Sequence, residues 1–143
     1  MASVNTYLSF KGNCEEAFIF YKAAFGGEFS HISRFKDMPK DESDCKVNDN
    51  ESDKIMHISL PIGDTTLMGC DVSEEWKSKV TEGNNFSISI LAESKDEANQ
   101  LFESLSEGGY VIMPMDKTFW DSYFGMFTDK FGIQWMVSFY SHT

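Results

Sequence analysis

Apolar and polar positions alternate with a helical period in two segments of the chain, Asn13–Gly27 (NCEEAFIFYKAAFGG) and Ser94–Gly109 (SKDEANQLFESLSEGG). Each segment opens with a residue able to cap a helix and has a glutamate three residues later, which is the capping-box spacing. Each closes on Gly-Gly, which favours a left-handed C-terminal cap. The capping pairs are Asn13 with Glu16 and Ser94 with Glu97. The apolar stripes are Ala17, Phe20, Tyr21 and Ala24 in the first helix and Ala98, Leu101, Phe102 and Leu105 in the second.

Strand-like runs surround the two helices in the same order. The runs NTYLSF and NFSISILA precede them, GEFSHISRF and YVIMPM follow, and IMHISLPIGDTTLMGC and YFGMFTDKFGIQWMVSF come next, each with a glycine-containing turn. The pattern predicts an α+β fold in which a strand–helix–strand–strand–strand (βαβββ) unit is used twice. We expect a single domain over 1–143, with unit one over about 1–72, unit two over about 85–143, and 72–84 joining them.

Alternation along the strands separates an apolar face from a mixed face. Three runs have apolar faces: Met56, Ile58 and Leu60; Phe86, Ile88 and Ile90; and Ile133, Trp135, Val137 and Phe139. The mixed faces carry His57 and Ser59; Ser87 and Ser89; and Gln134, Met136 and Ser138. The apolar faces are expected to pack against the helices. The mixed faces favour a curved eight-stranded sheet around a cavity.

Composition and charge restrict the classes of function. The 143 residues are 41% hydrophobic, which suits one globular domain, and the net charge of −11 argues against nucleic acid or an anionic membrane as partner. No apolar run approaches the length of a membrane helix, and no signal peptide is visible, so a cytoplasmic protein is expected. An acidic insertion over 37–54 reads as a solvated loop. The three cysteines, Cys14, Cys45 and Cys70, have no paired spacing and are expected to be free thiols, with a nucleophile among them as the alternative.

Three stretches resemble the vicinal oxygen chelate superfamily, which includes glyoxalase I, extradiol dioxygenases and fosfomycin-resistance proteins, and within it the PhnB-like branch. They are YLSFKGNCEEAFIFYKAAFGGE, IMHISLPIGDTTLMGCD and MPMDKTFWDSYFGMFTDKFGIQWM. The resemblance implies a glyoxalase-like fold in which one side chain from the first and last strand of each unit binds a divalent metal. The matching positions are Thr6, Met68, Ser87 and Met136. Hydroxyls and thioethers are not the imidazole and carboxylate donors of catalytic zinc, iron or nickel sites, so no metal is expected.

No organic cofactor is expected either. Some PhnB-like proteins carry the label of ubiquinone-pathway methyltransferases, but a nucleotide-sized cofactor is typically cradled by a glycine-rich turn between a strand and a helix. The Gly-Gly pairs of this chain stand at helix ends rather than helix starts.

Several single residues allow two interpretations. His57 is either a hydrogen-bonded structural residue or the polar contact or general base of a site. For His31 and His142 the structural interpretation is favoured. Asp71 is either a strand-end cap or a ligand contact. In the stretch 118–136, Phe127, Trp135 and Phe139 are expected in the core, while Phe119, Trp120 and Tyr123 line either a pocket mouth or a subunit interface.

The sequence therefore favours a protein that binds a small, partly apolar organic molecule. The predicted ligand-binding residues are Thr6, His57, Ser59, Met68, Ser87, Ser89, Trp120, Gln134 and Met136. The main alternative is a lyase or dioxygenase-type enzyme of the same superfamily that uses unconventional ligands around His57. A third possibility is a scaffold whose pocket has no function. Fold analogy alone does not choose among these.

A homodimer is predicted, because exposed Phe119, Trp120 and Tyr123 would give a monomer an apolar rim, and symmetric pairs are the commonest soluble assembly. Light scattering at micromolar concentration is expected to give twice the chain mass of 16.3 kDa. A mass of one chain at that concentration would contradict the prediction.

Overall fold

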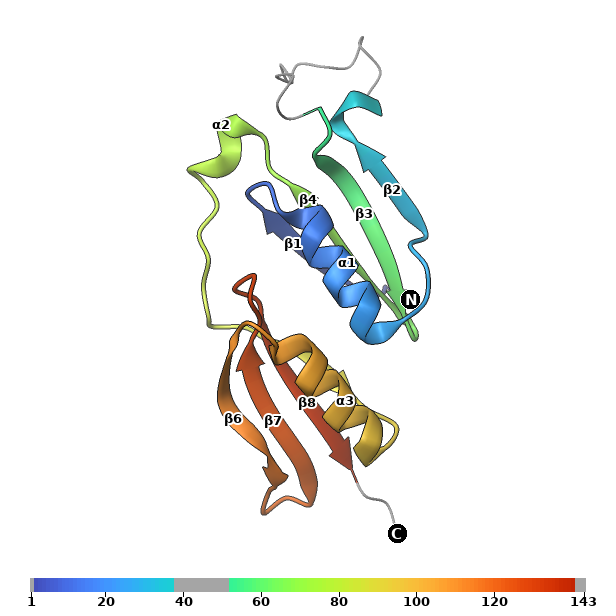
Figure 1. Ribbon diagram of the computed structural model, residues 1–143, viewed down its shortest axis with the longest axis vertical. Helices are drawn as coiled ribbons and strands as arrows, with labels where there is room; N and C mark the ends of the chain where they lie inside the picture. The colour runs from blue at the N-terminus through green and yellow to red at the C-terminus, as the bar shows by residue number, and fades with distance from the viewer. Residues whose placement is uncertain (1, 38–51, 141–143) are drawn as a thin grey trace. The chain divides into compact units, whose positions relative to one another are not determined.

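The computed structural model describes residues 2–37 and 52–140, and the chain divides into two compact units, Met1–Thr81 and Glu82–Thr143 (Figure 1). Most of the acidic insertion, together with Cys45 and His142, lies outside the described residues. The first unit contains β1 (Thr6–Phe10), α1 (Cys14–Phe25), β2 (His31–Arg34), a 3₁₀ turn η1 (Phe35–Asp37), β3 (Ile55–Ile62) and β4 (Thr65–Asp71). The short helix α2 (Glu74–Lys77), which the sequence pattern did not predict, follows β4. The second unit contains β5 (Ile88–Leu91), α3 (Lys95–Ser106), β6 (Tyr110–Lys117), β7 (Ser122–Thr128) and β8 (Gln134–Tyr140).

The two units have the same topology, which confirms the predicted repeat. The strand order is β1-β4-β3-β2 in the first and β5-β8-β7-β6 in the second. In each unit the first and last strands pair in parallel and the other neighbours pair antiparallel. The eight strands thus form two four-stranded mixed sheets, and one helix lies across one face of each (Figure 1).

The helices pack closely on glycines in the sheets. A Cβ built on Gly69 of β4 would lie 2.7 Å from the Phe18 ring of α1, and one on Gly125 of β7 would lie 2.8 Å from the Phe102 ring of α3. These glycines identify the helix-covered face of each sheet, because only a residue without a side chain admits the aromatic ring there. The core around them includes fully buried Phe18 and Phe127, and Trp135, which is 1% exposed.

Two residues that the pattern assigned to the helix-facing side lie elsewhere. Ser33 pairs with His57 and Arg34 with Ile55, so a bulge leaves Met56 as an extra residue on β3. Ile55 is therefore fully buried, while Met56 is half-buried. Phe86 precedes β5 and is 59% exposed. The alternation argument was wrong at both positions, because one residue broke the register and the other stood outside the strand.

The two helix starts are capped differently. At α3 the predicted cap by Ser94 is confirmed, since the Glu97 amide donates to Ser94 Oγ at 3.0 Å. The Glu97 carboxylate reaches back one residue further than in a capping box and accepts from the Glu93 amide. At α1 the side chain of Asn13 makes no capping bond, so that part of the prediction was wrong. The carboxylate of Asp71, at the end of β4, accepts from the first amide of α1 instead.

Asp71 is 2% exposed and connects three segments of the first unit. Its Oδ1 accepts from the amides of Gly12 at 3.0 Å and Cys14 at 2.9 Å, and its Oδ2 accepts from the amide of Ile55 at 3.0 Å. The start of α1 and the start of β3 are thereby attached to the end of β4. Of the two interpretations of Asp71, the strand-end cap matches this geometry, since both oxygens are engaged within the fold.

No helix among the described residues is long and apolar enough to cross a membrane.

Replacing Asp71 by Asn is predicted to lower the free energy of unfolding by about 2–3 kcal/mol, because a charged acceptor of buried amides is lost and an amide donor faces one of them. Urea unfolding followed by circular dichroism measures the change. Asp64→Asn in the exposed β3–β4 turn is the control and should change it by less than about 0.5 kcal/mol. Equal midpoints for the two variants would contradict this role of Asp71.

Candidate functional site

The face of the first sheet opposite α1, which we call the helix-free face of unit 1, carries most of that sheet's polar side chains. Strand register places two rows of residues on it. One row is His31, Ser59, Met68 and Tyr7, and the other is Ser33, His57, Cys70 and Ser9. Helix-covered residues such as Leu8 and Leu67 alternate with them along the strands and are buried.

A hydrogen-bonded array centred on His57 organises this face. The Tyr7 hydroxyl lies 3.4 Å from His57 Nδ1, and Ser59 Oγ lies 2.9 Å from His57 Nε2. On the neighbouring strand, Ser33 Oγ lies 3.2 Å from His31 Nε2. The His57 ring centroid is 5.4 Å from that of His31 and 5.7 Å from that of Tyr7. Both nitrogens of the His57 ring therefore have hydroxyl partners from the chain itself.

Tyr7 remains a neutral phenol in this array. Burial, and next the hydrogen bond with the Cys70 thiol, raise the pKa of Tyr7 well above the ordinary value for a tyrosine. The phenol therefore donates and accepts hydrogen bonds across the physiological range without becoming a phenolate.

The described cysteines are free thiols, as expected. Cys14 is fully buried, and burial, followed by the neighbouring Asp71 carboxylate, raises the pKa of its thiol. A thiol held in the neutral form is a poor nucleophile, so the catalytic alternative does not apply to Cys14. Cys70 is half-buried and stands on the helix-free face beside Tyr7.

In the first unit, His57 and Ser59 lie on the helix-free face, as the alternation predicted, and Met68, which the family resemblance selected, pairs with Ser59 on the same face. Thr6 does not join them. It pairs with buried Leu67. It also shares one strand face with Leu8 and Phe10, which are buried, so Thr6 lies on the helix-covered side. Tyr7 is the residue of β1 that reaches His57.

The second unit has a corresponding helix-free face, opposite α3. Ser89 pairs with Met136, and Gln134 pairs with Thr128, on the side away from Trp135 and Val137. Ser87 precedes the first residue of β5 and is half-buried. Trp120 lies between β6 and β7, and its ring centroid is 6.1 Å from that of Phe124, which belongs to the same face. Convergence of the two helix-free faces on one cavity stays a prediction.

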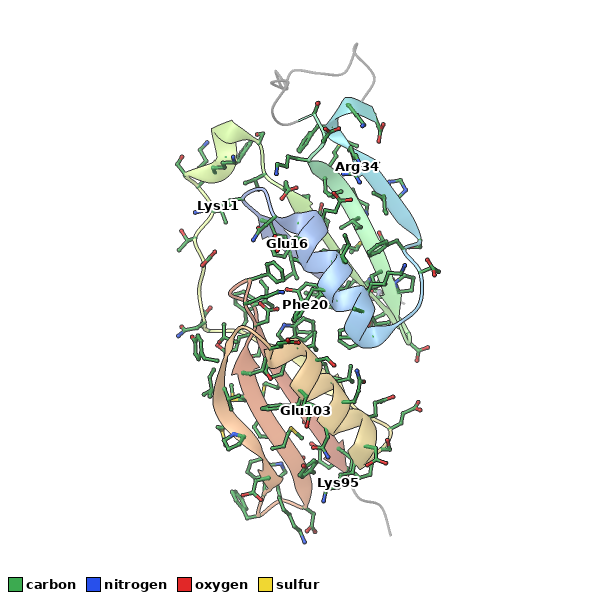
Figure 2. All side chains as sticks on the ribbon, viewed as in Figure 1. Lys11, Glu16, Phe20, Arg34, Lys95 and Glu103 are labelled. Atoms are coloured by element: carbon green, nitrogen blue, oxygen red, sulfur yellow. The ribbon has the colours of Figure 1, made fainter. Side chains whose placement is uncertain are left out.

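The aromatic residues before β7 separate into two kinds. Phe119 is 94% exposed and stacks edge-on against Trp120, which is 47% exposed. Tyr123 differs from the expectation, because its hydroxyl donates to Asn99 Oδ1 of α3 at 2.6 Å. In addition, Nζ of Lys95, the first residue of α3 (labelled in Figure 2), lies 4.8 Å from the Tyr123 ring centroid. Tyr123 therefore belongs to the helix-covered side, since β7 begins one residue earlier and its alternation points Tyr123 toward α3.

The sequence reasoning missed Tyr7, His31 and Ser33. The signal for Tyr7 was present, because two apolar residues at alternate positions, Leu8 and Phe10, already place Tyr7 and Ser9 on the opposite face. The pairing of His31 with Ser59 depends on which strands are neighbours, and no local pattern reports that.

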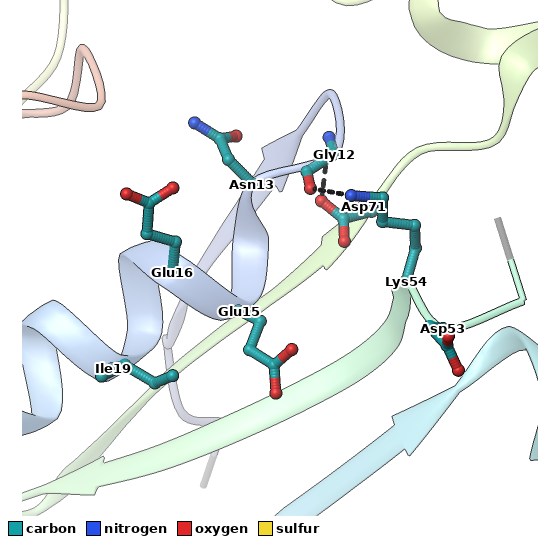
Figure 3. A pocket seen from close by; sticks show the side chains of 8 residues that line it. All are labelled: Gly12, Asn13, Glu15, Glu16, Ile19, Asp53, Lys54 and Asp71. Carbon is teal, nitrogen blue, oxygen red and sulfur yellow. Dashed lines mark hydrogen bonds between the residues drawn. The ribbon is translucent and has the colours of Figure 1, made fainter. Parts of the chain in front are cut away.

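A separate pocket of about 620 Å³ lies beside the start of α1 (Figure 3). It is lined by Gly12, Asn13, Glu15, Glu16, Ile19, Asp53, Lys54 and Asp71. Much of its polar lining is already paired: Lys54 Nζ donates to the Gly12 carbonyl at 2.8 Å, and Lys36 Nζ donates to Asp53 Oδ1 at 2.9 Å.

Glu15 of the same pocket is paired with Arg34 of β2, and Figure 2 labels Arg34. The hydrogen bond from Arg34 is the main cause that lowers the pKa of Glu15. The pocket therefore reads as a surface depression with internally paired walls, and we place the candidate site on the helix-free face.

Two βαβββ units with this strand order define a glyoxalase-like protein. Residues 3–137 match the Glyoxalase/Bleomycin resistance protein/Dioxygenase superfamily, and the chain belongs to that superfamily. It is 39% identical to protein PA1353 of Pseudomonas aeruginosa, with a TM-score of 0.83 over 99% of this chain and 100% of that one. It is 25% identical to the PhnB protein of Bacillus cereus, with a TM-score of 0.74 over 96% and 99% of the two chains. Protein YjdN of Escherichia coli K12 is 28% identical over 94% of this chain and 93% of its own length.

The residues present do not fit the divalent metal that the superfamily implies. The four matching positions supply two hydroxyls and two thioethers, and the two His57 nitrogens already bond to Tyr7 and Ser59. Within residues 2–37 and 52–140, no group of three or more His, Cys, Asp or Glu side chains is arranged to hold a metal ion. Such donors are what catalytic zinc, iron and nickel sites require.

Elemental analysis of the purified protein is predicted to find far less than one transition metal ion per chain. About one equivalent of zinc, nickel, iron or manganese, lost on changing His57 to Ala, would contradict this prediction. A metal retained by the His57→Ala variant would instead be bound elsewhere in the chain.

Proposed function

We propose that this superfamily member binds a small, partly apolar organic molecule against its helix-free faces, without a resident divalent metal. The observation that carries the proposal is the Tyr7–His57–Ser59 array in the first unit. It places polar groups beside the weakly polar, sulfur-containing side chains of Met68 and Cys70. A few oriented polar groups among apolar surfaces are typical of small-ligand sites.

The mixed character of the second unit supports the same proposal. Its helix-free face combines Ser89 and Gln134 with the flexible side chains of Met126 and Met136 and the rings of Phe124 and Trp120. Methionine and aromatic side chains adapt to apolar ligands of varied shape, while the amide and hydroxyl groups provide orientation.

A second candidate function is a lyase or dioxygenase-type enzyme with unconventional ligands. The observation in its favour is the position of His57 between two hydroxyls, because an imidazole that bonds to a phenol on one nitrogen and an alcohol on the other can relay a proton. Turnover of a bound molecule, lost in His57→Ala, would favour this function over binding alone.

His57→Ala is predicted to weaken ligand binding at least about tenfold, a loss of about 1.4 kcal/mol, while the melting temperature changes little. The reason is that Tyr7 is 48% exposed and can bond to solvent once the ring is removed, while Ser59 is 7% exposed but the space left by the imidazole admits water to its hydroxyl. A panel of small organic acids, phenols and amides, screened by thermal shift and titrated calorimetrically, provides the ligand.

Ser9→Ala, on the same face but outside the array, is the matched control and should bind as the wild type does. A His57→Ala variant that melts far lower yet binds normally would show that the histidine is structural and would remove the support for the proposed site. A panel with no hit on the wild-type chain would contradict the proposal itself.

A further inference from the structure

Among the described residues, none that strand register assigns to the helix-free face of unit 1 is a carboxylate, although the chain has 23 acidic residues against 12 lysines and arginines. The residues that register assigns to this face are Tyr7, Ser9, His31, Ser33, His57, Ser59, Pro61, Thr66, Met68 and Cys70. Two imidazoles are thus the only groups of this set whose protonation would give the face a positive charge. A surface of this kind tolerates an anion in a protein that otherwise repels anions.

The geometry of the His31–His57 pair is that of a site that binds a carboxylate or similar anion. The two ring centroids are 5.4 Å apart on neighbouring strands, so two imidazolium rings at this distance would repel each other. An anion beside both rings removes that repulsion. We infer that the ligand of the helix-free face, whose binding is the proposed function above, is a small organic anion with an apolar body, held by His57 and His31 in their protonated forms.

The hydroxyls around His57 provide the donors. A neutral imidazole offers one donor and one acceptor, so either the Tyr7 or the Ser59 hydroxyl must donate to the ring. An imidazolium donates from both nitrogens, and both hydroxyls then accept. The hydrogens of both hydroxyls are then free for another acceptor, whereas with the neutral ring one of them is held by the imidazole. The Ser33 hydroxyl, which lies 3.2 Å from His31 Nε2, likewise accepts from that nitrogen when His31 is protonated.

The other groups that face the His31–His57 pair add no charge to it. From β1 comes the Tyr7 phenol, which stays neutral, and from β4 come Met68 and the Cys70 thiol. The Arg34–Glu15 ion pair belongs to the helix-covered side, because Glu15 is on α1. Among the described residues of this sheet, the two histidines are therefore the basic groups that face the ligand.

The sign of the pH dependence follows from linkage. An anion that binds the imidazolium form more tightly raises the pKa of the histidine, so affinity is greatest at low pH and falls as pH rises. Where binding takes up a proton, the affinity is expected to fall by up to tenfold per pH unit for each histidine that must be protonated. A ligand held only by apolar contacts would show no such dependence.

Benzoate and its neutral isostere benzamide test the inference on the full chain. Imidazole resonances of His31 and His57 are titrated by NMR from pH 5 to 8 with and without each probe, and affinities are measured by calorimetry. We expect benzoate to raise the His57 pKa and to bind more weakly as pH rises, and benzamide to do neither. His57→Gln keeps a donor and an acceptor in place of the ring but has no charge. It should lose at least about tenfold in benzoate affinity at pH 5.5 and keep only the weaker pH dependence that His31 provides.

His31→Gln should give a smaller loss in the same direction, because His57 keeps the two hydroxyls of Tyr7 and Ser59 beside it, whereas His31 has the hydroxyl of Ser33. Equal, pH-independent binding of benzoate and benzamide would overturn the anionic class while leaving the proposed small-molecule site intact. Benzoate binding that His57→Gln and His31→Gln do not change would also overturn it, since the anion would then bind elsewhere. Failure of both probes to bind would overturn it as well, and the wider ligand panel decides the proposed function separately.

Discussion

The first unit depends on one buried carboxylate, that of Asp71. Its two oxygens bind amides from the β1–α1 connection and from the start of β3, segments more than forty residues apart in the sequence. Unpaired buried amides are costly, so a single charged acceptor that satisfies three of them holds β1, α1, β3 and β4 in register. The helix-free face inherits its geometry from that register, because His57 lies two residues after the amide of Ile55 that Asp71 accepts.

The second unit uses a buried carboxylate for a different purpose. Asp129 is 3% exposed, and its oxygens accept from the amides of Phe131 and Ile133 and from Trp135 Nε1 at 2.8 Å. It therefore fixes the β7–β8 turn and the central core tryptophan rather than a helix start, which Ser94 and Glu97 cap locally. The units share one topology but stabilise it by different chemistry, so one unit is a poor guide to the polar contacts of the other.

The candidate site shows how far a family pattern can be carried onto a sequence. Transfer of the superfamily's metal positions selected Thr6 on β1, whereas strand register puts Tyr7 beside His57 and Thr6 beside buried Leu67. A shift of one residue along a strand exchanges its faces, so positional transfer without register selects the wrong side chain. The absence of imidazole and carboxylate donors at the matching positions does not depend on register in this way, because neither Thr6 nor Tyr7 supplies one.

The sequence by itself determined the doubled βαβββ order, both helices and the mixed faces containing His57, Ser59 and Met136, because periodicity and capping are local properties of the chain. It also located the core at Phe127 and Trp135. Only the tertiary structure decided that Asp71 caps α1, and that a bulge at Met56 puts Ile55 in the buried position that Met56 was expected to fill. It alone also showed that Tyr123 faces α3 and that His31 stands beside His57. Each of these depends on which strands and helices are neighbours, and that choice is made by burial and hydrogen bonding summed over the whole unit rather than by any short stretch of sequence.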